Sequence, residues 1–306
     1  MESMPGVELC QLPENCIATI FSFSSPKDVG RFSLVCSVFK SVSESDAVWR
    51  SFIPCDYQAL ISQFSDPSLL STYPSAKDLY LRLSSNPIIF DNGKKSFGLD
   101  KWSGKKMIML SARDLIIEWS DTVRYWEWSN AQHKSRFAEV AGLINVYWLE
   151  IRGKIKATML SPETHYTAHL VYRLVAASHG LDTYPVEVNV GISGAEGDYS
   201  KRSLYLDPRK ERRQRNQVVV RRVGLCGYMH AMTLQLPAPV TENNNDHHNH
   251  IRPKERQDGW LEIELGDYFN RQDEVGDLEI SILETNADHL KNGLLIQGID
   301  IRPKSN

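Results

Sequence analysis

Three histidines lie close together in one polar stretch of the chain, His247, His248 and His250. Imidazole nitrogens are common zinc ligands, so a metal site is one interpretation. The surrounding residues 243–249 are otherwise asparagine and aspartate, a composition typical of an exposed loop. The sequence therefore favours a solvated loop, and no bound metal is expected.

Two further stretches come close to catalytic patterns without matching them. The run Gly191-Ile192-Ser193-Gly194 lacks the glycine spacing of a nucleophile elbow. Residues 98–106 contain two glycines six positions apart and end on Lys106, where a phosphate-binding loop needs Ser or Thr. No enzyme class is indicated, and no cofactor is expected.

Composition sets wider limits on the protein. The 306 residues, 42% of them hydrophobic, can form about two globular domains. A net charge of −3 provides no chain-wide positive field for nucleic acid. The five cysteines form no C-x-x-C pair, and no apolar run approaches the length of a membrane span. We expect a reduced compartment, cytosol or nucleus, and neither nucleic acid nor membrane as a partner.

The N-terminal region, residues 1–55, predicts three short helices. Pro13 suits the first turn of one helix, and Ser25 with Asp28 forms a capping pair for the next. So small and apolar a bundle is marginal alone and is expected to pack on a partner or a neighbouring domain. Residues 56–89 are interpreted as a helical connector, with helices over 57–64 and 75–83 and Ser75 and Asp78 capping the second.

From residue 90 to the C-terminus the hydrophobic period changes from 3.6 to 2. Apolar residues alternate with polar ones over 149–155, 166–174, 186–192, 261–265, 278–282 and 299–301. Many short alternating strands predict a β-sandwich or an open barrel. Two stretches, 201–222 and 237–258, break the alternation and are expected to be exposed loops. The predicted fold is α+β, with a helical bundle, a helical connector and an all-β domain.

The spacing of apolar residues in the N-terminal region resembles an F-box. F-boxes bind a Skp-type adaptor and attach a substrate receptor to a cullin-based ubiquitin ligase. The resemblance assigns adaptor binding to these residues: Leu12, Pro13, Ile17, Ile20, Val29, Phe32, Val35, Phe39 and Trp49. A helical cap that only covers the β domain is the alternative.

The C-terminal two-thirds of the chain is similar to the plant phloem lectin family, phloem protein 2. The segments that carry the similarity are 109–115, 119–128, 148–155, 258–266 and 297–304. The resemblance implies a jelly-roll-like β-sandwich that recognises N-acetylglucosamine oligomers or N-glycan cores.

Four residues match the sugar site that this resemblance implies. The stacking tryptophans fall on Trp119 and Trp126, and the carboxylates on Asp277 and Glu284, the first of which is a glutamate in the family. An indole stacks on the apolar face of a pyranose while carboxylates accept from its hydroxyls, so we expect Trp126 to be partly exposed. Trp119 and Trp126 as core residues is the alternative. Three other tryptophans are assigned to the core: Trp128, Trp148 and Trp260.

Asp277 and Glu284 also admit interpretation as a glycosidase pair. Their spacing of seven places them on opposite faces of a regular strand, and the family is non-catalytic, so this interpretation is disfavoured.

The function expected from both resemblances is that of a substrate-receptor subunit of a Skp-cullin-F-box ubiquitin ligase with a lectin-like domain. The alternative is a stress-related lectin, or a protein–protein receptor, that acts without ligase function. The basic run Arg209–Arg215 is interpreted either as a nuclear-import patch or as a solvated loop. Cytoplasm and nucleus are the expected locations.

Overall fold

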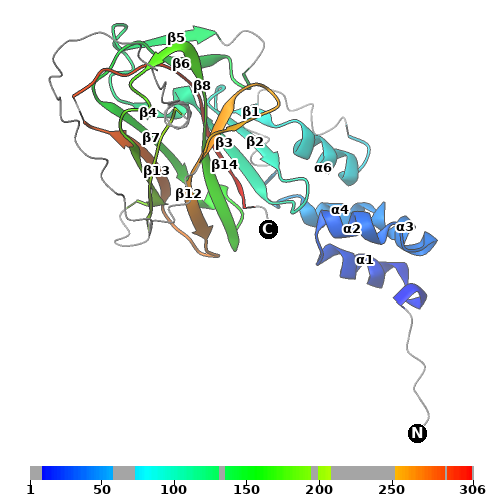
Figure 1. The fold of residues 1–306 in the computed structure, drawn as a ribbon. Coiled ribbons are helices and arrows are strands. Elements are labelled where there is room, and N and C mark those ends of the chain that lie inside the picture. The colour runs from blue at the N-terminus through cyan, green and yellow to red at the C-terminus, as the bar shows by residue number, and fades with distance from the viewer. Residues whose placement is uncertain are drawn as a thin grey trace, which may run out of the picture.

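A computed structural model describes residues 9–57, 73–130, 135–193, 199–207, 252–286 and 288–304. A small group of helices projects from one end of a two-sheet β-sandwich (Figure 1). The predicted order of helical bundle, connector and β domain is confirmed. Among the described residues, no helix has the length and apolar character needed to cross a bilayer.

The N-terminal unit has four short α-helices where the sequence predicted three. A 3-10 turn, η1 (Leu9–Gln11), precedes α1 (Glu14–Ser22), α2 (Pro26–Phe32), α3 (Ser37–Ser43) and α4 (Asp46–Phe52). The predicted second helix is divided at Cys36, whose backbone is extended at φ −157°. The Phe39 amide donates to Cys36 Sγ over 3.5 Å, so Cys36 caps a new helix. The predicted Ser25 cap is confirmed, since Ser25 Oγ accepts from the Asp28 amide over 3.1 Å.

The connector contributes helix α6 (Ala76–Ser85), which lies between the N-terminal helices and the sandwich. Its predicted cap is present, with the Asp78 amide donating to Ser75 Oγ over 3.1 Å. The other predicted connector helix, over 57–64, lies almost wholly outside the described residues.

Helix α6 places Tyr80 at the junction of the two domains. The Tyr80 ring lies 5.1 Å from that of Trp49, and its hydroxyl donates to the Asp100 carbonyl oxygen over 3.0 Å. Lys106 Nζ donates to Asp56 Oδ2 over 2.6 Å at the same junction. One continuous hydrophobic core runs from the helices through Tyr80 into the sandwich. The prediction that the small bundle packs on a neighbouring domain is confirmed.

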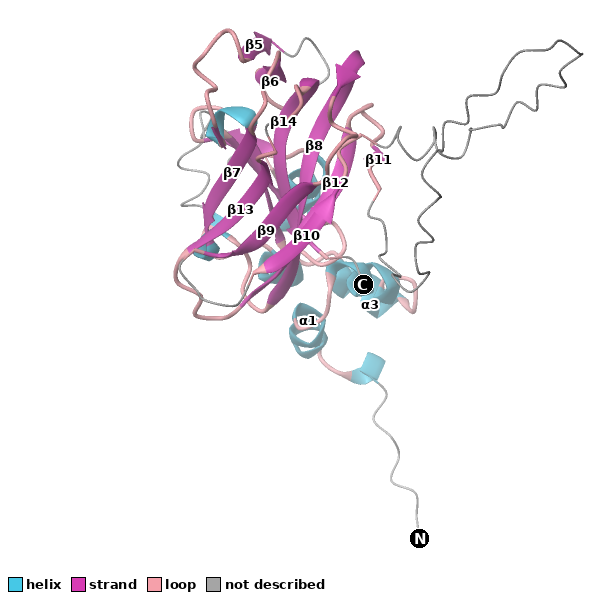
Figure 2. Cartoon of the chain, turned by 60° about the vertical axis from the view of Figure 1, so that its left-hand side comes forward, coloured by secondary structure: helices cyan, strands magenta, loops and turns pink. Residues whose placement is uncertain are grey.

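The sandwich is formed by two antiparallel sheets. The strands of the larger sheet are β1 (Ile88–Phe90), β2 (Lys95–Leu99), β3 (Lys106–Ser111), β14 (Asn292–Pro303), β8 (Thr164–His179), β12 (Leu261–Asn270) and β11 (Lys254–Glu255), in that order. Two more strands, β5 (Trp126–Asn130) and β6 (Glu139–Leu143), join this sheet through β6 and β14. The smaller sheet has the order β10 (Ser200–Leu204), β9 (Val186–Ile192), β13 (Asp277–Glu284), β7 (Leu149–Lys156) and β4 (Ile116–Ile117). Figure 2 shows β7, β13, β9 and β10 side by side.

Period-2 alternation explains how the sheets face each other. In β7 the odd-numbered residues Leu149, Ile151, Gly153 and Ile155 are buried, while even-numbered residues point outward. A Cβ at Gly153 would lie 3.2 Å from Ile299 Cδ1 of the other sheet, so the sheets approach closely there. All six predicted alternating segments are strands.

Two predicted loops are partly wrong. Ser200–Leu204 forms edge strand β10 and Lys254–Glu255 forms β11, because each pairs with a neighbouring strand that the local composition does not reveal. Residues 208–222 of the first stretch and 237–251 of the second lie outside the described residues. They include Arg209–Arg215 and the three histidines.

Gly298 interrupts β14 at a shift in its pairing with β8. Its φ is +156°, and a Cβ there would lie 1.9 Å from the Leu110 carbonyl oxygen. Only glycine allows this close approach of β14 to β3.

Candidate functional site

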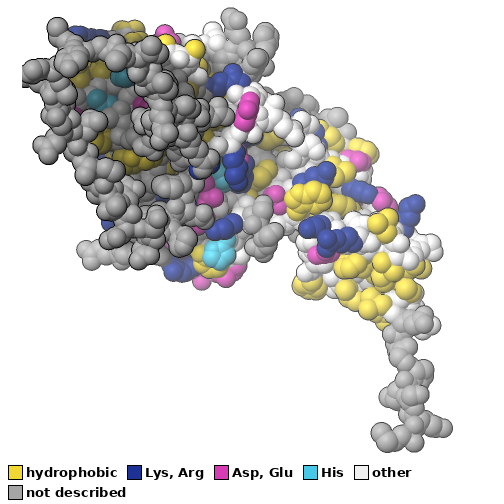
Figure 3. Space-filling view, in the orientation of Figure 1, with side chains coloured by type: hydrophobic (Ala, Val, Ile, Leu, Met, Phe, Trp, Pro, Cys, Tyr) yellow, Lys and Arg dark blue, Asp and Glu magenta, His cyan; other side chains and the backbone are white. Residues whose placement is uncertain are grey.

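A group of large apolar side chains is exposed on the F-box helices. We call it the F-box apolar surface, and its members, with their exposed fractions, are Leu9 (49%), Ile20 (44%), Phe23 (86%), Leu34 (86%) and Val35 (63%). Figure 3 shows hydrophobic side chains gathered on the part of the helical unit far from the sandwich. Exposed apolar side chains gathered on one part of a protein surface are typical of a protein interaction site.

The nine predicted adaptor-binding residues divide into two groups. Pro13, Ile20 and Val35 are exposed, and Leu12 and Phe32 are partly buried. The other four, Ile17, Val29, Phe39 and Trp49, are buried at 0–8% exposure and form the core of the bundle. They position the surface residues and are not available for contact. Leu9, Phe23 and Leu34 were missed, because they lie outside the helical stripes that periodicity detects.

Two exposed tryptophans lie in the segments that lead into β5 and β7. Figure 1 shows β5 and β6 at the end of the sandwich away from helices α1 to α4. Trp119 is 43% exposed and its ring lies 5.7 Å from that of Tyr125. The neighbouring Glu118 amide donates to the Glu150 carbonyl oxygen, which places this segment beside the start of β7. Trp148 is 40% exposed, so its assignment to the core was wrong. Trp119 is therefore accessible from solvent, and its role as a stacking residue stays a prediction.

Trp126 is buried, and the expectation that it is partly exposed was wrong. Its side chain is 2% exposed, and its Nε1 donates to the Glu118 carbonyl oxygen over 3.1 Å. Trp260, also 2% exposed, is a core residue as predicted. Trp128 is partly buried, with the Arg113 guanidinium stacked 3.6 Å from its ring centre. An indole as buried as that of Trp126 offers no face to a sugar in this conformation.

The predicted carboxylates lie at opposite ends of β13. Asp277 is exposed and pairs in register with Lys156, whereas Glu284 pairs with Leu149. Seven residue steps of about 3.3 Å separate them by about 23 Å. The structure therefore brings Trp119, Trp126 and Glu284 to one end of the sandwich and Asp277 to the other.

Glu284 is almost completely buried and forms an ion pair with Lys291. Lys291 Nζ also donates to the Tyr147 carbonyl oxygen over 2.7 Å, and the Asn286 amide donates to Glu284 Oε1 over 2.8 Å. Burial lowers the pKa of Lys291 to about 8. This pair holds the loop between β13 and β14, which is a structural role.

A groove of about 380 Å³ lies on the outer face of the five-stranded sheet. Its lining residues come from four neighbouring strands and one loop: Arg152, Asn189, Tyr199, Lys201, Glu279, Ser281 and Leu283. Sequence analysis missed these residues, because alternation shows which residues of one strand share a face but not which strands are neighbours.

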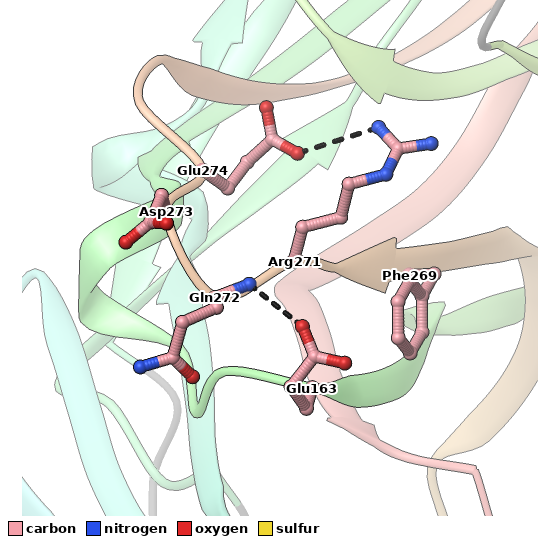
Figure 4. Close-up of a pocket in the computed structure, with 6 residues that line it drawn as sticks. All are labelled: Glu163, Phe269, Arg271, Gln272, Asp273 and Glu274. Atoms are coloured by element: carbon pink, nitrogen blue, oxygen red, sulfur yellow. Dashed lines mark hydrogen bonds and ion pairs between the residues drawn. The ribbon is translucent and has the colours of Figure 1, made fainter.

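A second hollow, of about 570 Å³, surrounds the turn after β12 (Figure 4). Its polar groups contact each other. The backbone N–H of Gln272 donates to Glu163 Oε1 over 2.8 Å, and Arg271 Nη1 lies 3.6 Å from Glu274 Oε2. These contacts hold the turn.

The two C-terminal motifs, 258–266 and 297–304, meet on the outer face of the nine-stranded sheet. Arg302 donates two hydrogen bonds to Glu262, over 3.0 and 2.7 Å, across the intervening strand β8. Arg256 Nη1 lies 3.2 Å from Glu262 and 3.3 Å from Asp300. Burial is the largest influence on the pKa of Glu262 and acts to raise it, but the Arg302 hydrogen bonds and the positive charges of Arg302, His169 and Arg256 together lower that pKa. These motif residues hold β12 and β14 to β8.

Among the described residues, no cluster of histidine, cysteine, aspartate and glutamate could hold a metal ion.

Comparison with known proteins matches the two parts of the chain separately. The F-box-like family model matches residues 9–54, and the phloem protein 2 model matches residues 105–303. The Arabidopsis thaliana protein named F-box protein PP2-B1 is 38% identical over 308 residues, covering 96% of this chain and 89% of the relative. F-box protein VBF from the same plant is 38% identical over 297 residues, covering 97% of this chain and all of the relative.

Solved structures share only a distant likeness. The xylan-binding domain CBM22-1 of Paenibacillus barcinonensis Xyn10C is 12% identical over 64% of this chain and 90% of its own, with a TM-score of 0.29. The Podospora anserina GH26-CBM35 mannanase is 11% identical over 65% of this chain and 28% of its own, with a TM-score of 0.31. The family matches and the Arabidopsis relatives together show that the chain belongs to the phloem protein 2 family, in the form that carries an N-terminal F-box.

Proposed function

We propose that this protein is the substrate-receptor subunit of a Skp-cullin-F-box ubiquitin ligase. Its F-box binds the Skp-type adaptor, and through it the cullin, while the sandwich recognises N-acetylglucosamine oligomers or N-glycans on glycoprotein targets. The combination of F-box and phloem protein 2 domains supports a substrate-receptor role. The chain acts as a binding protein in the cytoplasm and nucleus, without catalysis, metal or cofactor of its own.

The observation that carries this proposal is the F-box apolar surface. Five large apolar side chains are 44–86% exposed there, although other apolar side chains of the bundle, such as Ile17, Val29 and Val48, are buried in the core that continues into the sandwich. Burying each in an interface is worth roughly 1.5–3 kcal/mol before the costs of association. A partner with a complementary apolar groove therefore gains substantially from docking on these helices.

The shared core supports the same proposal. Trp49 and Phe52 of α4 pack on Tyr80 with ring distances of 5.1 and 6.3 Å, and Tyr80 is hydrogen-bonded into the sandwich. Because these contacts tie α4 and α6 to the segment after β2, we expect an adaptor bound to the F-box to be held in one orientation relative to a target on the sandwich.

Carbohydrate recognition is supported by the exposed tryptophans of the sandwich. Trp119 and Trp148 are 43% and 40% exposed, and Trp148 Nε1 donates to the Glu150 carboxylate over 3.0 Å. Fixed indoles next to an ionised carboxylate suit a pyranose, which presents an apolar face and a rim of hydroxyls.

Adaptor binding is tested with the full-length chain and a plant Skp-type adaptor in co-purification and calorimetric titration. Leu34→Asp introduces a charge at an 86% exposed position of the F-box apolar surface, and Val275→Asp does the same at an 84% exposed position on the sandwich. We expect Leu34→Asp to raise the Kd for the adaptor at least about tenfold, because burying an unpaired charge in an interface costs free energy. Val275→Asp should bind like the wild type.

Equal binding by Leu34→Asp and the wild type would refute the assignment of this surface. If the adaptor does not bind the wild-type chain at all, the ligase role is wrong. Glycan binding that persists in that case would support a lectin that acts alone.

A further inference from the structure

Strand pairing aligns a polar row across the outer face of the five-stranded sheet. In register, Arg152 of β7 pairs with Ser281 of β13, Ser281 pairs with Asn189 of β9, and Asn189 pairs with Lys201 of β10. The four side chains therefore point to the same side of four neighbouring strands, which Figure 2 shows together. The pairing makes neighbours of Arg152 and Ser281, which are 129 positions apart in the sequence, and of Ser281 and Asn189, which are 92 positions apart.

Side-chain size explains why this row lies in a groove. The middle positions carry short side chains, Ser281 and Asn189, with Asn189 Nδ2 donating to Ser281 Oγ over 3.3 Å. Gly191 adds no side chain opposite Glu279 in the next row. The longer side chains of Arg152, Lys201 and Tyr199 stand around this floor and enclose about 380 Å³. That volume lies within the range of small-ligand sites.

Glu279 is a fixed, ionised acceptor at one side of the floor. It accepts from Ser193 Oγ over 3.2 Å and lies 3.3 Å from Arg152 Nη1 and 3.4 Å from Lys154 Nζ. Burial is the largest influence on the pKa of Glu279 and acts to raise it, but the hydrogen bonds from Lys154, Ser193 and Arg152 and the charge of Lys154 together lower that pKa. The carboxylate therefore stays charged and its cations stay in place.

Arg152 and Trp148 are held in the same way. Arg152 Nε donates to Glu150 Oε1 over 2.7 Å, and Trp148 Nε1 donates to the other oxygen over 3.0 Å. Trp148 precedes β7 and has the same even parity as Glu150 and Arg152, so all three belong to the outer face. The face thus carries oriented donors and acceptors between an indole and the phenol of Tyr199.

We propose that this groove binds a neutral saccharide chain, lying across β7, β13, β9 and β10. Arg152, Lys154 and Lys201 are opposed by Glu150 and Glu279, so the charges nearly balance and favour an uncharged ligand over a polyanion or a polycation. Sugar hydroxyls both donate and accept, as the amide, hydroxyl, guanidinium and carboxylate groups here do. Tyr199 supplies an aromatic wall for an apolar sugar face.

The groove does not suit an extended peptide that adds a strand to the sheet. Strand addition uses the free backbone groups of an edge, and the edges of this sheet are β10 and β4. The groove instead lies over β13 and its neighbours, whose backbone groups are already paired. Recognition here must use side chains. The proposal rests on the carbohydrate part of the proposed function and does not depend on adaptor binding.

The test applies the full-length protein to an array of neutral, sulfated and sialylated oligosaccharides. Tyr199→Ala and Asn189→Ala each remove one contact from the groove. Glu274→Gln, in the hollow of Figure 4, is the matched control, and Trp119→Ala reports on the other end of the sandwich. We expect the signal on neutral oligosaccharides to fall roughly tenfold in each groove variant, the effect of one lost stacking or hydrogen-bonding contact. Glu274→Gln should keep it.

The other outcomes overturn the proposal in different ways. A signal that survives Tyr199→Ala and Asn189→Ala but is lost in Trp119→Ala places the ligand at the distal end and leaves the proposed lectin function intact. A signal confined to sulfated or sialylated glycans shows an anion site. A flat array from wild-type protein with a normal thermal melt refutes both this groove and carbohydrate recognition, while adaptor binding is scored separately.

Discussion

Replacing Trp126 with alanine should destabilise the sandwich strongly. The indole is 2% exposed and its Nε1 donates to the Glu118 carbonyl oxygen. Truncating a buried tryptophan to alanine costs about 3–5 kcal/mol, because the transfer free energy is lost and a cavity remains. The lost hydrogen bond adds about 1 kcal/mol or less, since Glu118 is exposed and water can replace the donor.

The measurement is urea denaturation of the full-length chain, together with a thermal melt. For a domain of this size, each kcal/mol shifts the melting temperature by about 2–4 °C, so a fall of about 6–20 °C is expected. Trp119→Ala is the matched control, because its side chain is 43% exposed and its loss should cost under about 1 kcal/mol.

Two results would refute this reasoning. A Trp126→Ala protein within about 1 kcal/mol of the wild type would mean that the indole is not part of the core. Equal destabilisation by Trp119→Ala would mean that exposure does not distinguish the two residues. If both expectations hold, Trp119→Ala is the clean variant for testing sugar stacking, and Trp126→Ala is not.

Glu284→Gln should lower the free energy of unfolding by about 3–5 kcal/mol, because Lys291 then stays buried without its carboxylate. The double variant with Lys291→Met should recover much of that loss in urea denaturation. A Glu284→Gln midpoint equal to that of the wild type would show that the pair is solvated. Burial lowers the pKa of His169 below its ordinary 6.5. As the pH falls, the unfolded chain therefore binds a proton at this histidine before the folded protein does, and the free energy of unfolding should decrease below pH 6.5. The decrease should be less steep in His169→Gln. Parallel profiles of stability against pH for the two proteins would contradict this. Gly298→Ala should lower the free energy of unfolding by at least about 2 kcal/mol, because the added Cβ meets a backbone carbonyl. Gly93→Ala, where no atom lies within 4 Å of the added Cβ, should lower it by only about 1 kcal/mol. Similar denaturation midpoints for the two variants would exclude the close contact at Gly298.

Local structure was largely predictable from the sequence. Ser25 and Ser75 each cap a helix, as expected, because a cap depends on residues only three positions apart. Period-2 alternation identified the core strands for the same reason, since the face of a residue within one strand is a local property. The two family resemblances rest on ordered sets of such local features.

Helix boundaries were less predictable where a local feature competed with periodicity. Val29, Phe32, Cys36 and Phe39 have helical spacing, yet Cys36 is extended and begins a new helix. Edge strand β10 was missed because its residues gain their structure from pairing with β9 and not from their own pattern.

The candidate sites depended on tertiary structure. The sequence places Trp119 and Trp126 seven positions apart with similar contexts, but only packing decides that the first is exposed and the second buried. It also cannot show that Lys291 neutralises Glu284, or that Arg152, Ser281, Asn189 and Lys201 form one row. Residue type and spacing determine which chemistry is available and which face of an element carries it. Strand order and register determine which of those faces meet, since they depend on contacts between segments that are distant in the chain.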